Sequence, residues 1–416
     1  MLPDLQTSIP GPESLRLAKE LREHESRNVT YVDPSWPIFW EKAEGVNVWD
    51  ADGNRFLDLT SAFGVGGLGH RHPEIVAAMR EQSERLLHGM GDVHPTALKG
   101  QLCAELSKIT FERWTGEGGE VVLSNSGFEA IETALKTARL ATGKNGVIAF
   151  SNGYHGLGYG SLLGTDLKKF QGPFIEQLAP VTTRLPYGGD EIEQVDGEKI
   201  GAVLVEPMQG RGGKVIPPPE FLECLRRWCD AHGALLIFDE IYTGFWRTGT
   251  MFACERDGIV PDLICLGKAL SSGFPISACV GKSEVMDAWP ESPGEALHTS
   301  TFLGHPVGCA MAMKSLEILQ RPETVELVAQ TSALLEEKLR SLQGDKIIEI
   351  RGRGIMWGVE LRENAGALLG DLLKEGLIML ADGPEGNVLS FTPPFTMGEV
   401  EMDFAIEKVS ERLGLS

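Results

Sequence analysis

A series of short apolar segments between residues 120 and 281 constrains the fold more than any other feature. The segments carry no alternation of polar side chains, and helical patterns such as 128–141 and 220–232 separate several of them. Strands of this kind are typical of a largely parallel sheet with helices on both faces. The sequence therefore predicts an α/β sandwich over roughly residues 60–305. In chain order, the segments are EVVLS, GVIAF, GAVLVE, ALLIFD, LICLG and SACVG.

The chain is too long for one simple core, because it has 416 residues. A helical pattern over 13–24 and a hairpin around the turn pair Asp52-Gly53 precede the sandwich. Two long helical patterns, further short strands and a closing helix near 398–413 follow it. We therefore expect an N-terminal segment 1–60 that joins the small domain, a large domain 61–305, and a C-terminal small α+β domain 306–416.

The charge of the chain excludes several classes of partner. Asp and Glu number 59 against 38 Lys and Arg, which gives a formal net charge of -21. Such a charge repels nucleic acid and anionic membranes, so an anionic ligand needs a local positive pocket. No apolar run approaches the ~20 residues of a membrane helix, and no secretory signal is evident. Seven scattered cysteines without a CxxC pair indicate a reducing compartment, and we expect a cytoplasmic protein.

Two charged residues follow apolar strands directly. Lys268, in PDLICLGKALSSGFP, stands where a strand leaves the sheet. Desolvation there favours a neutral, nucleophilic amine that can form a Schiff base, although a lysine reaching from a strand end into solvent is the simpler alternative. Asp239 ends the strand in ALLIFDEIYTGFWRTG. Ligands bind at such carboxyl ends, and the pyridine nitrogen of pyridoxal phosphate is one cation that a buried Asp could pair with; a metal-binding or structural aspartate is the alternative.

Two turns after strands add a phosphate site and an aromatic surface. In SNSGFEAIETALKTAR, a strand ends in a turn that opens a helix, where backbone N–H groups and the positive helix end can bind phosphate. Ordinary capping by Ser124 or Ser126 explains the same pattern. In SNGYHG, Tyr154 follows another strand and could stack on a flat ring. The phosphate turn, the aromatic residue, the acid and the lysine occur in that order, spaced as on successive strands.

With these motifs the chain resembles the class III (ω-amino acid) aminotransferases from about Phe39 to its end. The family has the fold-type I, aspartate aminotransferase-like architecture: a large, mostly parallel-sheet domain that binds pyridoxal phosphate and a smaller α+β domain. Further blocks that resemble the family are GNRFLDLTSAFGVGGLGHRHPEIVAAM, VLVEPMQGRGG, LGKALSSGFP and HTSTFLGHPVGCAMA.

The resemblance implies a role for each matching residue. Lys268 is the Schiff-base lysine, Asp239 pairs with the pyridine nitrogen, and Glu206, with Gln209 alongside, orients the catalytic site. Thr301 is expected to bind the cofactor phosphate of a partner subunit, which implies a homodimer. The expected cofactor-binding residues are Ser126, Gly127, Phe128, Tyr154, His155, Asp239, Ile241, Lys268 and Thr301, and no metal is expected.

The implied reaction is transamination by a ping-pong mechanism. The amino group passes from an amine or ω-amino acid to the cofactor and then to a 2-oxo acid such as pyruvate or 2-oxoglutarate. Racemisation or epimerisation, an aminomutase reaction and decarboxylation use the same Lys268 and Asp239, so they remain alternatives. A cofactor-binding module without catalysis is disfavoured, because Lys268, Asp239 and Tyr154 are all present.

Two positions depart from the family in residues that select the substrate. Many relatives carry Glu in EPxQGEGG and Arg three residues before a late Pro-Pro pair, whereas this chain has Arg211 and Ser390 there. Our hypothesis is that Arg211 supplies the carboxylate anchor from the opposite wall; the alternative is that Arg211 points into solvent. Phe63 and Trp246 are further candidates for the substrate pocket, with core packing as their alternative.

Two other patterns do not carry chemistry. Gly64, Gly66 and Gly69 spell GxGxxG, but the helix after them leads to another helix rather than to the second strand of a dinucleotide site. Four histidines at 70, 72, 88 and 94 lack the spacing or the acidic cluster of a metal site.

Overall fold

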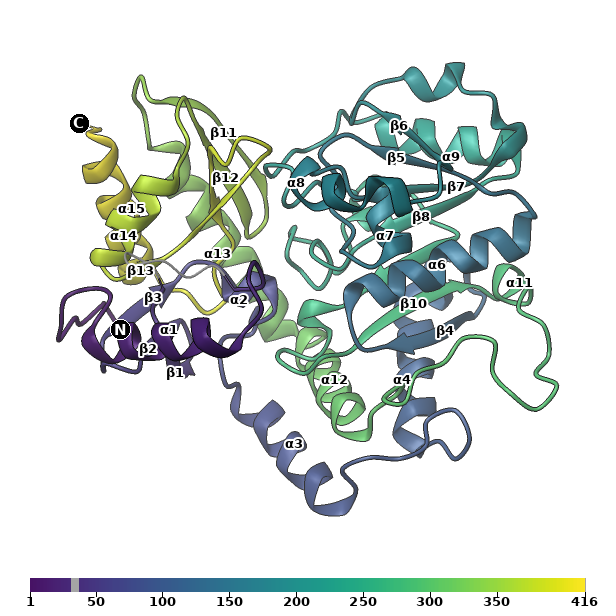
Figure 1. The fold of residues 1–416 in the computed structure, drawn as a ribbon, viewed down its shortest axis with the longest axis horizontal. Coiled ribbons are helices and arrows are strands. Elements are labelled where there is room, and N and C mark those ends of the chain that lie inside the picture. Colours follow the sequence, from purple (N-terminus) through teal and green to yellow (C-terminus); the bar gives the residue numbers. More distant parts are fainter. Residues whose placement is uncertain (31–36, 416) are drawn as a thin grey trace. The chain divides into compact units, whose positions relative to one another are not determined.

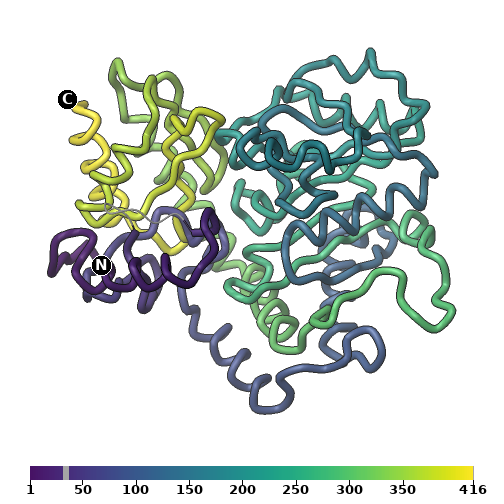
Figure 2. The backbone as a smooth tube through the Cα atoms, viewed as in Figure 1, coloured from purple at the N-terminus to yellow at the C-terminus, as the bar shows by residue number. Residues whose placement is uncertain are grey.

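The computed structural model describes residues 1–30 and 37–415, and the chain forms two compact units (Figure 1). Unit 1 comprises Met1–His72 and Glu326–Ser416, and unit 2 comprises Pro73–Val325. Both divisions lie C-terminal to the boundaries that the sequence suggested at 60/61 and 305/306. Both chain termini belong to unit 1 (Figure 2).

Local contacts explain where the two divisions lie. Ser61 donates its hydroxyl to the carbonyl of Thr392, and the N–H of Phe395 donates to the carbonyl of Gly67. These bonds attach the segment after residue 60 to the C-terminal part of unit 1. Helix α12 (Pro306–Leu319) packs against α3 (Pro73–Arg85) and α4, so it belongs to unit 2.

Within the described part of the chain, unit 2 is built on a seven-stranded sheet with the order β4-β10-β9-β8-β7-β5-β6. Strand β10 is antiparallel to both of its neighbours, and the other neighbouring pairs are parallel. The mostly parallel α/β architecture predicted from the sequence is confirmed. The strands are β4 (Gly119–Ser124), β5 (Gly146–Phe150), β6 (Thr182–Leu185), β7 (Ile200–Val205), β8 (Leu235–Asp239), β9 (Leu263–Leu266) and β10 (Ser277–Lys282).

The helices of unit 2 follow the predicted patterns, and the ribbon shows α6 lying along the sheet (Figure 1). One stripe of α6 is buried against β7, β8 and β9, which accounts for the apolar strands having no polar alternation. The helical segments of unit 2 are α3, α4 (Ala97–Ser107), η1 (Lys108–Glu112), α5 (Arg113–Thr115), α6 (Gly127–Thr142), α7 (Tyr159–Gly164), α8 (Lys168–Gln171), η2 (Gly172–Gln177), η3 (Glu191–Gln194), η4 (Gly197–Lys199), α9 (Phe221–His232), α10 (Cys254–Asp257), η5 (Lys268–Leu270), α11 (Ser283–Met286) and α12.

Unit 1 contains, in its described residues, two four-stranded sheets with the orders β1-β2-β3-β13 and β11-β12-β15-β14. The predicted hairpin is present, because β2 and β3 pair antiparallel around Asp52-Gly53, and β13 joins β3 in parallel. The elements are α1 (Pro12–His24), β1 (Trp40–Glu44), β2 (Asn47–Asp50), β3 (Arg55–Asp58), α2 (Ser61–Gly64), β11 (Ile347–Arg353), β12 (Met356–Leu361), α14 (Gly366–Lys374), β13 (Leu377–Ile378), β14 (Leu380–Asp382), β15 (Val388–Phe391) and α15 (Glu399–Leu413); α13 (Pro322–Arg340) crosses the division.

The short element α2 is a left-handed turn. The φ angles of Ser61, Ala62 and Phe63 are 49°, 48° and 62°, and that of Gly64 is 82°. Left-handed backbone costs L-residues about 1–2 kcal/mol each, so the turn needs support from its surroundings. The buried carboxylate of Asp58 gives it, by accepting hydrogen bonds from the backbone of Thr60 and Ala62.

Candidate active site

Three charged side chains lie at or just beyond the carboxyl ends of neighbouring parallel strands in unit 2. Glu206 follows β7, Asp239 ends β8, and Lys268 lies two residues beyond β9. Because the register pairs Val205 with Phe238 and Asp239 with Cys265, these strands end at the same edge of the sheet. This edge is where open α/β sheets bind ligands. The structure therefore brings together the acid and the lysine that the sequence singled out.

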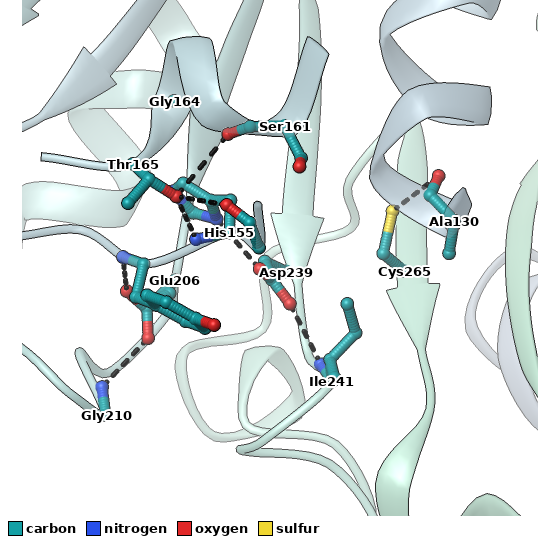
Figure 3. A network of polar contacts seen from close by, with 12 residues as sticks. Ala130, His155, Ser161, Gly164, Thr165, Glu206, Gly210, Asp239, Ile241 and Cys265 are labelled. Atoms are coloured by element: carbon teal, nitrogen blue, oxygen red, sulfur yellow. Dashed lines mark hydrogen bonds and ion pairs between the residues drawn. The ribbon is translucent and has the colours of Figure 1, made fainter. Parts of the chain in front are cut away.

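Asp239 is buried and held from both sides. Its Oδ2 atom lies 2.8 Å from Nδ1 of His155, and its Oδ1 atom accepts a hydrogen bond of 3.0 Å from the N–H of Ile241 (Figure 3). The imidazole of His155 is buried as well. The two contacts fix the plane of the carboxylate, and a buried carboxylate of this kind is suited to a cationic partner.

Glu206 is the second buried acid at this edge. It accepts a hydrogen bond from the N–H of Tyr154 at 3.0 Å. It accepts another from the N–H of Gly210 at 2.8 Å, which is drawn in Figure 3. Burial raises the pKa of Glu206; nearby His155 opposes this shift, and the charge of Asp239 adds to it. Glu206 thereby connects the strand end to two loops, which carry Tyr154 and Gly210.

The amine of Lys268 has an unusual environment. Burial lowers the pKa of Lys268 to about 8, with Lys214 and Arg211 acting in the same direction and the carboxylates of Asp239 and Glu206 acting against it. Its φ angle is 43°, a strained value for a residue with a side chain. A lysine with such a pKa carries a substantial neutral fraction near pH 7, as a nucleophilic amine requires.

The turn between β4 and α6 serves in part as a helix cap. The carboxylate of Glu129 accepts hydrogen bonds from the N–H groups of Asn125 and Ser126 and from the Ser126 hydroxyl. The capping role that the sequence left open for Ser126 is therefore real. In contrast, the described residues offer no hydrogen-bond partner to the N–H groups of Gly127 and Phe128, which begin a 16-residue helix. These two donors at the positive end of α6 are suited to a phosphate.

Ile241 and Tyr154 supply the apolar surfaces near these polar groups. A methyl group on Gly127 would lie 3.1 Å from the side chain of Ile241, and one on Gly267 would lie 3.3 Å from it. Ile241 thus packs between the phosphate turn and the segment that leads into Lys268. The ring centroid of Tyr154 lies 5.9 Å from the ring centroid of Phe170.

Arg211 stacks on aromatic rings. Its guanidinium carbon lies 4.8 Å from the ring centroid of Tyr154 and 5.7 Å from that of Phe170. Across the described residues, it forms no ion pair with a carboxylate. The guanidinium is therefore held beside the candidate site with its charge uncompensated by a direct partner.

The remaining substrate candidates belong to different units. The indole N–H of Trp246 donates to the carbonyl of Leu319 at 2.8 Å, which anchors this side chain on helix α12. Phe63 belongs to unit 1, where the left-handed turn leaves its side chain 57% exposed. Ser390 is buried in β15 of the same unit and carries no charge.

Thr301 lies on an exposed loop of unit 2. The neighbouring Ser300 accepts a hydrogen bond of 3.0 Å from the side-chain amide of Asn125, next to the phosphate turn. Thr301 itself is exposed. Within the described ranges, no group of three or more His, Cys, Asp or Glu side chains is arranged to hold a metal ion, and no helix is long and apolar enough to cross a membrane.

Two residues near Lys268 were missed by the sequence reasoning. The ring centroid of Tyr242 lies 4.6 Å from Nζ of Lys268 and 4.7 Å from Nζ of Lys214. Lys214 is fully buried. The one signal in the sequence was its position, three residues after Arg211 in the same glycine-rich turn, QGRGGK.

Comparison with known proteins identifies the family. The family model described as aminotransferase class-III matches residues 30–413. The chain belongs to the class III aminotransferases. This aminotransferase is 36% identical over 382 residues to the acetylornithine aminotransferase of Methanopyrus kandleri, covering 92% of this chain and 95% of the relative. It is 35% identical over 446 residues to the 4-aminobutyrate aminotransferase of Mycobacterium leprae, with 99% and 98% covered.

Solved structures agree with this assignment. The ornithine aminotransferase of Toxoplasma gondii matches with a TM-score of 0.85 at 30% identity and covers 95% of this chain and 93% of its own. This chain is thus a transaminase that depends on pyridoxal phosphate, as the sequence predicted. The comparisons give no support to a racemase, aminomutase or decarboxylase activity.

The residues present fit pyridoxal phosphate. The unpartnered N–H groups of Gly127 and Phe128 match its phosphate, the buried carboxylate of Asp239 matches its ring nitrogen, and the amine of Lys268 matches its aldehyde.

Proposed function

We propose that this transaminase takes its amino group from an ω-amino acid and passes it to a 2-oxo acid. Relatives are named for acetylornithine, 4-aminobutyrate and ornithine, each of which combines a primary amine with a carboxylate. The observation that carries the proposal is the guanidinium of Arg211, which stacks on Tyr154 without a carboxylate partner among the described residues. Such a group is free to bind the carboxylate of either substrate.

We propose that Lys268 holds the cofactor covalently and later moves the proton. When bound, pyridoxal phosphate supplies an electron sink for the bonds at the donor carbon. Nζ of Lys268, once released from the cofactor, would accept the proton from the donor carbon and deliver it to the cofactor carbon that carried the aldehyde. A pKa near 8 allows both steps around neutral pH, because the amine is then close to balance between its two protonation states.

The two buried acids position the site in this proposal. Asp239 would pair with the ring nitrogen and keep it protonated, and His155 and the N–H of Ile241 hold the plane of its carboxylate. Glu206 keeps the loops that carry Tyr154 and Gly210 next to the strand ends. The N–H groups of Gly127 and Phe128 bind the phosphate, with Ser126 shaping the turn.

Arg211 is proposed as the carboxylate anchor because this chain lacks the arginine of many relatives at Ser390. A hydrogen bond between charged groups contributes roughly 1.5–3 kcal/mol, and a guanidinium can form two in parallel to one carboxylate. The aromatic rings of Tyr154 and Phe170 hold the guanidinium in place before the substrate arrives, which reduces the mobility lost on binding. Phe63 and Trp246 remain proposed contributors to the pocket wall.

The working form is proposed to be a homodimer in which Thr301 binds the phosphate of the partner subunit's cofactor. The exposed loop around Thr301 also carries Phe302, which is 56% exposed and whose ring centroid lies 5.1 Å from that of His88. On either side of His88 in the sequence, Leu87 and Met90 are 64% and 55% exposed. Apolar side chains of this number are typical of a covered surface.

All seven cysteines are free thiols, which supports a cytoplasmic location.

The substrate proposal is tested by measuring the two half-reactions separately. Donors with and without a carboxylate (4-aminobutyrate and ornithine against butylamine and benzylamine) are mixed with the enzyme, and loss of the visible absorbance of the bound cofactor is followed. We expect faster loss with the carboxylate donors, and recovery on adding 2-oxoglutarate or pyruvate. Equal rates for butylamine and 4-aminobutyrate would contradict the proposal.

A further inference from the structure

Lys214 is a buried charge that the proposed reaction does not use. It lies in the turn Gly210–Lys214, its side chain is 0% exposed, and its Nζ atom lies 3.4 Å from the carbonyl of Gly210. Its φ angle is 56°, in the left-handed region that L-residues rarely adopt. A residue that is both buried and strained is usually held in place by its surroundings for a reason.

The ring of Tyr242 brings Lys214 close to Lys268. The two ammonium nitrogens lie 4.7 Å and 4.6 Å from the same ring centroid, so they can be no farther apart than the sum of these distances. Two cations so close, with Lys214 removed from water, repel each other with little screening by salt. Both nitrogens contact the ring of Tyr242, and this shared contact limits the distance between them.

Other charged groups around Lys268 also shift its pKa. The carboxylates of Asp239 and Glu206 favour its protonated form, and Arg211 opposes it. His155 contacts Asp239 rather than the amine. In the active enzyme, Asp239 is proposed to pair with the ring nitrogen, so it favours the protonated form of Lys268 less. The cations of the turn Gly210–Lys214 then have a larger share in setting the pKa of Lys268.

We propose that Lys214 is a positioning residue for transamination: its positive charge, held beside the same Tyr242 ring that Lys268 contacts, disfavours a second positive charge and so keeps the amine of Lys268 neutral. This inference rests on the proposed role of Lys268. A neighbouring cation activates an amine in this way because it makes a second positive charge unfavourable. The geometry also separates the roles of the two cations in this turn: Arg211 faces Tyr154, and Lys214 faces Tyr242.

The test measures cofactor uptake by the full-length enzyme after its cofactor has been removed. The rate at which visible absorbance appears with added pyridoxal phosphate is recorded from pH 6.5 to 9.5, because only the neutral amine of Lys268 attacks the aldehyde. For the unmodified enzyme, the midpoint of the pH dependence of the uptake rate is expected at pH about 8. The ionisation of free pyridoxal phosphate is common to all variants and cancels in the comparison.

Lys214→Met is expected to raise this midpoint by on the order of one pH unit, and to slow uptake at pH 7 about tenfold. Lys214→Arg keeps the charge and should restore the midpoint of the unmodified enzyme. Lys214→Gln is a second neutral variant in case the Met variant folds poorly. Lys199→Met is the matched control, because it makes the same change on an exposed lysine.

The outcomes separate this inference from the proposed function. If Lys214→Met and Lys214→Gln take up the cofactor with an unchanged midpoint, the inference about Lys214 is wrong while the proposed function stands. The same holds if Lys214→Arg shifts the midpoint as much as Lys214→Met does. If the unmodified enzyme takes up no cofactor, or if Lys268→Ala takes it up with the same absorbance, the proposed role of Lys268 fails and this inference fails with it.

Discussion

Nδ1 of His155 lies 2.8 Å from Oδ2 of Asp239, and both side chains are buried at the end of strand β8. The contact joins the loop after strand β5 to the end of strand β8, through the carboxylate proposed to pair with the cofactor ring. A hydrogen bond to a charged group contributes about 1.5–3 kcal/mol, so its loss is expected to be measurable in catalysis.

Replacing His155 with Phe removes this hydrogen bond while filling a similar volume. We expect kcat to fall between about tenfold and a hundredfold, because Asp239 loses its orientation. His24→Phe, on the exposed surface of α1, is the control and should leave kcat unchanged. Steady-state kinetics with one donor and one acceptor make the measurement, and a His155→Phe enzyme with an unaltered kcat would show that the contact has no part in the reaction.

Lys268 should lower the stability of the cofactor-free enzyme in a pH-dependent way. Its pKa is about 8 in the folded chain against an ordinary lysine pKa of 10.5, so between these two pH values the unfolded chain binds more protons. Stability therefore rises with pH across this window, and the full cost of burying the ammonium is present below pH 8. Lys268→Met removes this cost.

Thermal unfolding of the cofactor-free proteins at several pH values tests the sign of this effect. The gain in Tm of Lys268→Met over the unmodified chain should be largest below pH 8 and should shrink as the pH approaches 10.5. A gain that stays constant across that window would show that the amine of Lys268 is not desolvated. Lys199→Met again serves as the control.

Arg211→Ala should separate carboxylate binding from chemistry. The loss of a charge-assisted pair is expected to raise KM for 2-oxo acid acceptors at least tenfold with a much smaller change in kcat. Arg211→Lys retains the charge but not the paired geometry, so its KM should lie between the values of the unmodified enzyme and of Arg211→Ala. An unchanged KM in Arg211→Ala would mean that the guanidinium contacts solvent or protein rather than substrate.

Mixing two inactive variants tests the proposed role of Thr301. If Thr301 serves the partner subunit, a hybrid of Lys268→Met and Thr301→Ala chains has one site with both lesions and one intact site. The intact site should bind pyridoxal phosphate with the affinity of the unmodified enzyme. If Thr301 served its own subunit, every site of the hybrid would carry one lesion, and no high-affinity site would form.

The sequence predicted the sheet of unit 2 where burial leaves a clear pattern. Strands β7, β8 and β9 are apolar throughout because helices cover both faces, and their ends located Asp239 and Lys268. Strand β6 was missed, because this edge strand is half-buried and has one apolar residue, Leu185. Its sequence, TTRL, resembles a loop until the neighbouring strand is known.

Other features depend on tertiary contacts that no local pattern encodes. Ser61, Ala62 and Phe63 have no intrinsic preference for left-handed backbone, and their turn exists because Asp58 binds it. The hydrogen bond between Tyr154 and Glu206 spans 52 residues of sequence. Lys214 was missed for the same reason, since its burial beside Tyr242 arises only when the turn Gly210–Lys214 folds onto the strand ends.

The most direct measurement is to locate the covalent bond between the cofactor and the chain. The full-length enzyme is incubated with pyridoxal phosphate, the bond is fixed by borohydride reduction, and the digested protein is mapped by mass spectrometry. We predict one modified peptide with the cofactor on Nζ of Lys268, and no label at Lys214. Label on a different lysine, or a protein that takes up no cofactor, would contradict the assignment of Lys268 as the reactive amine.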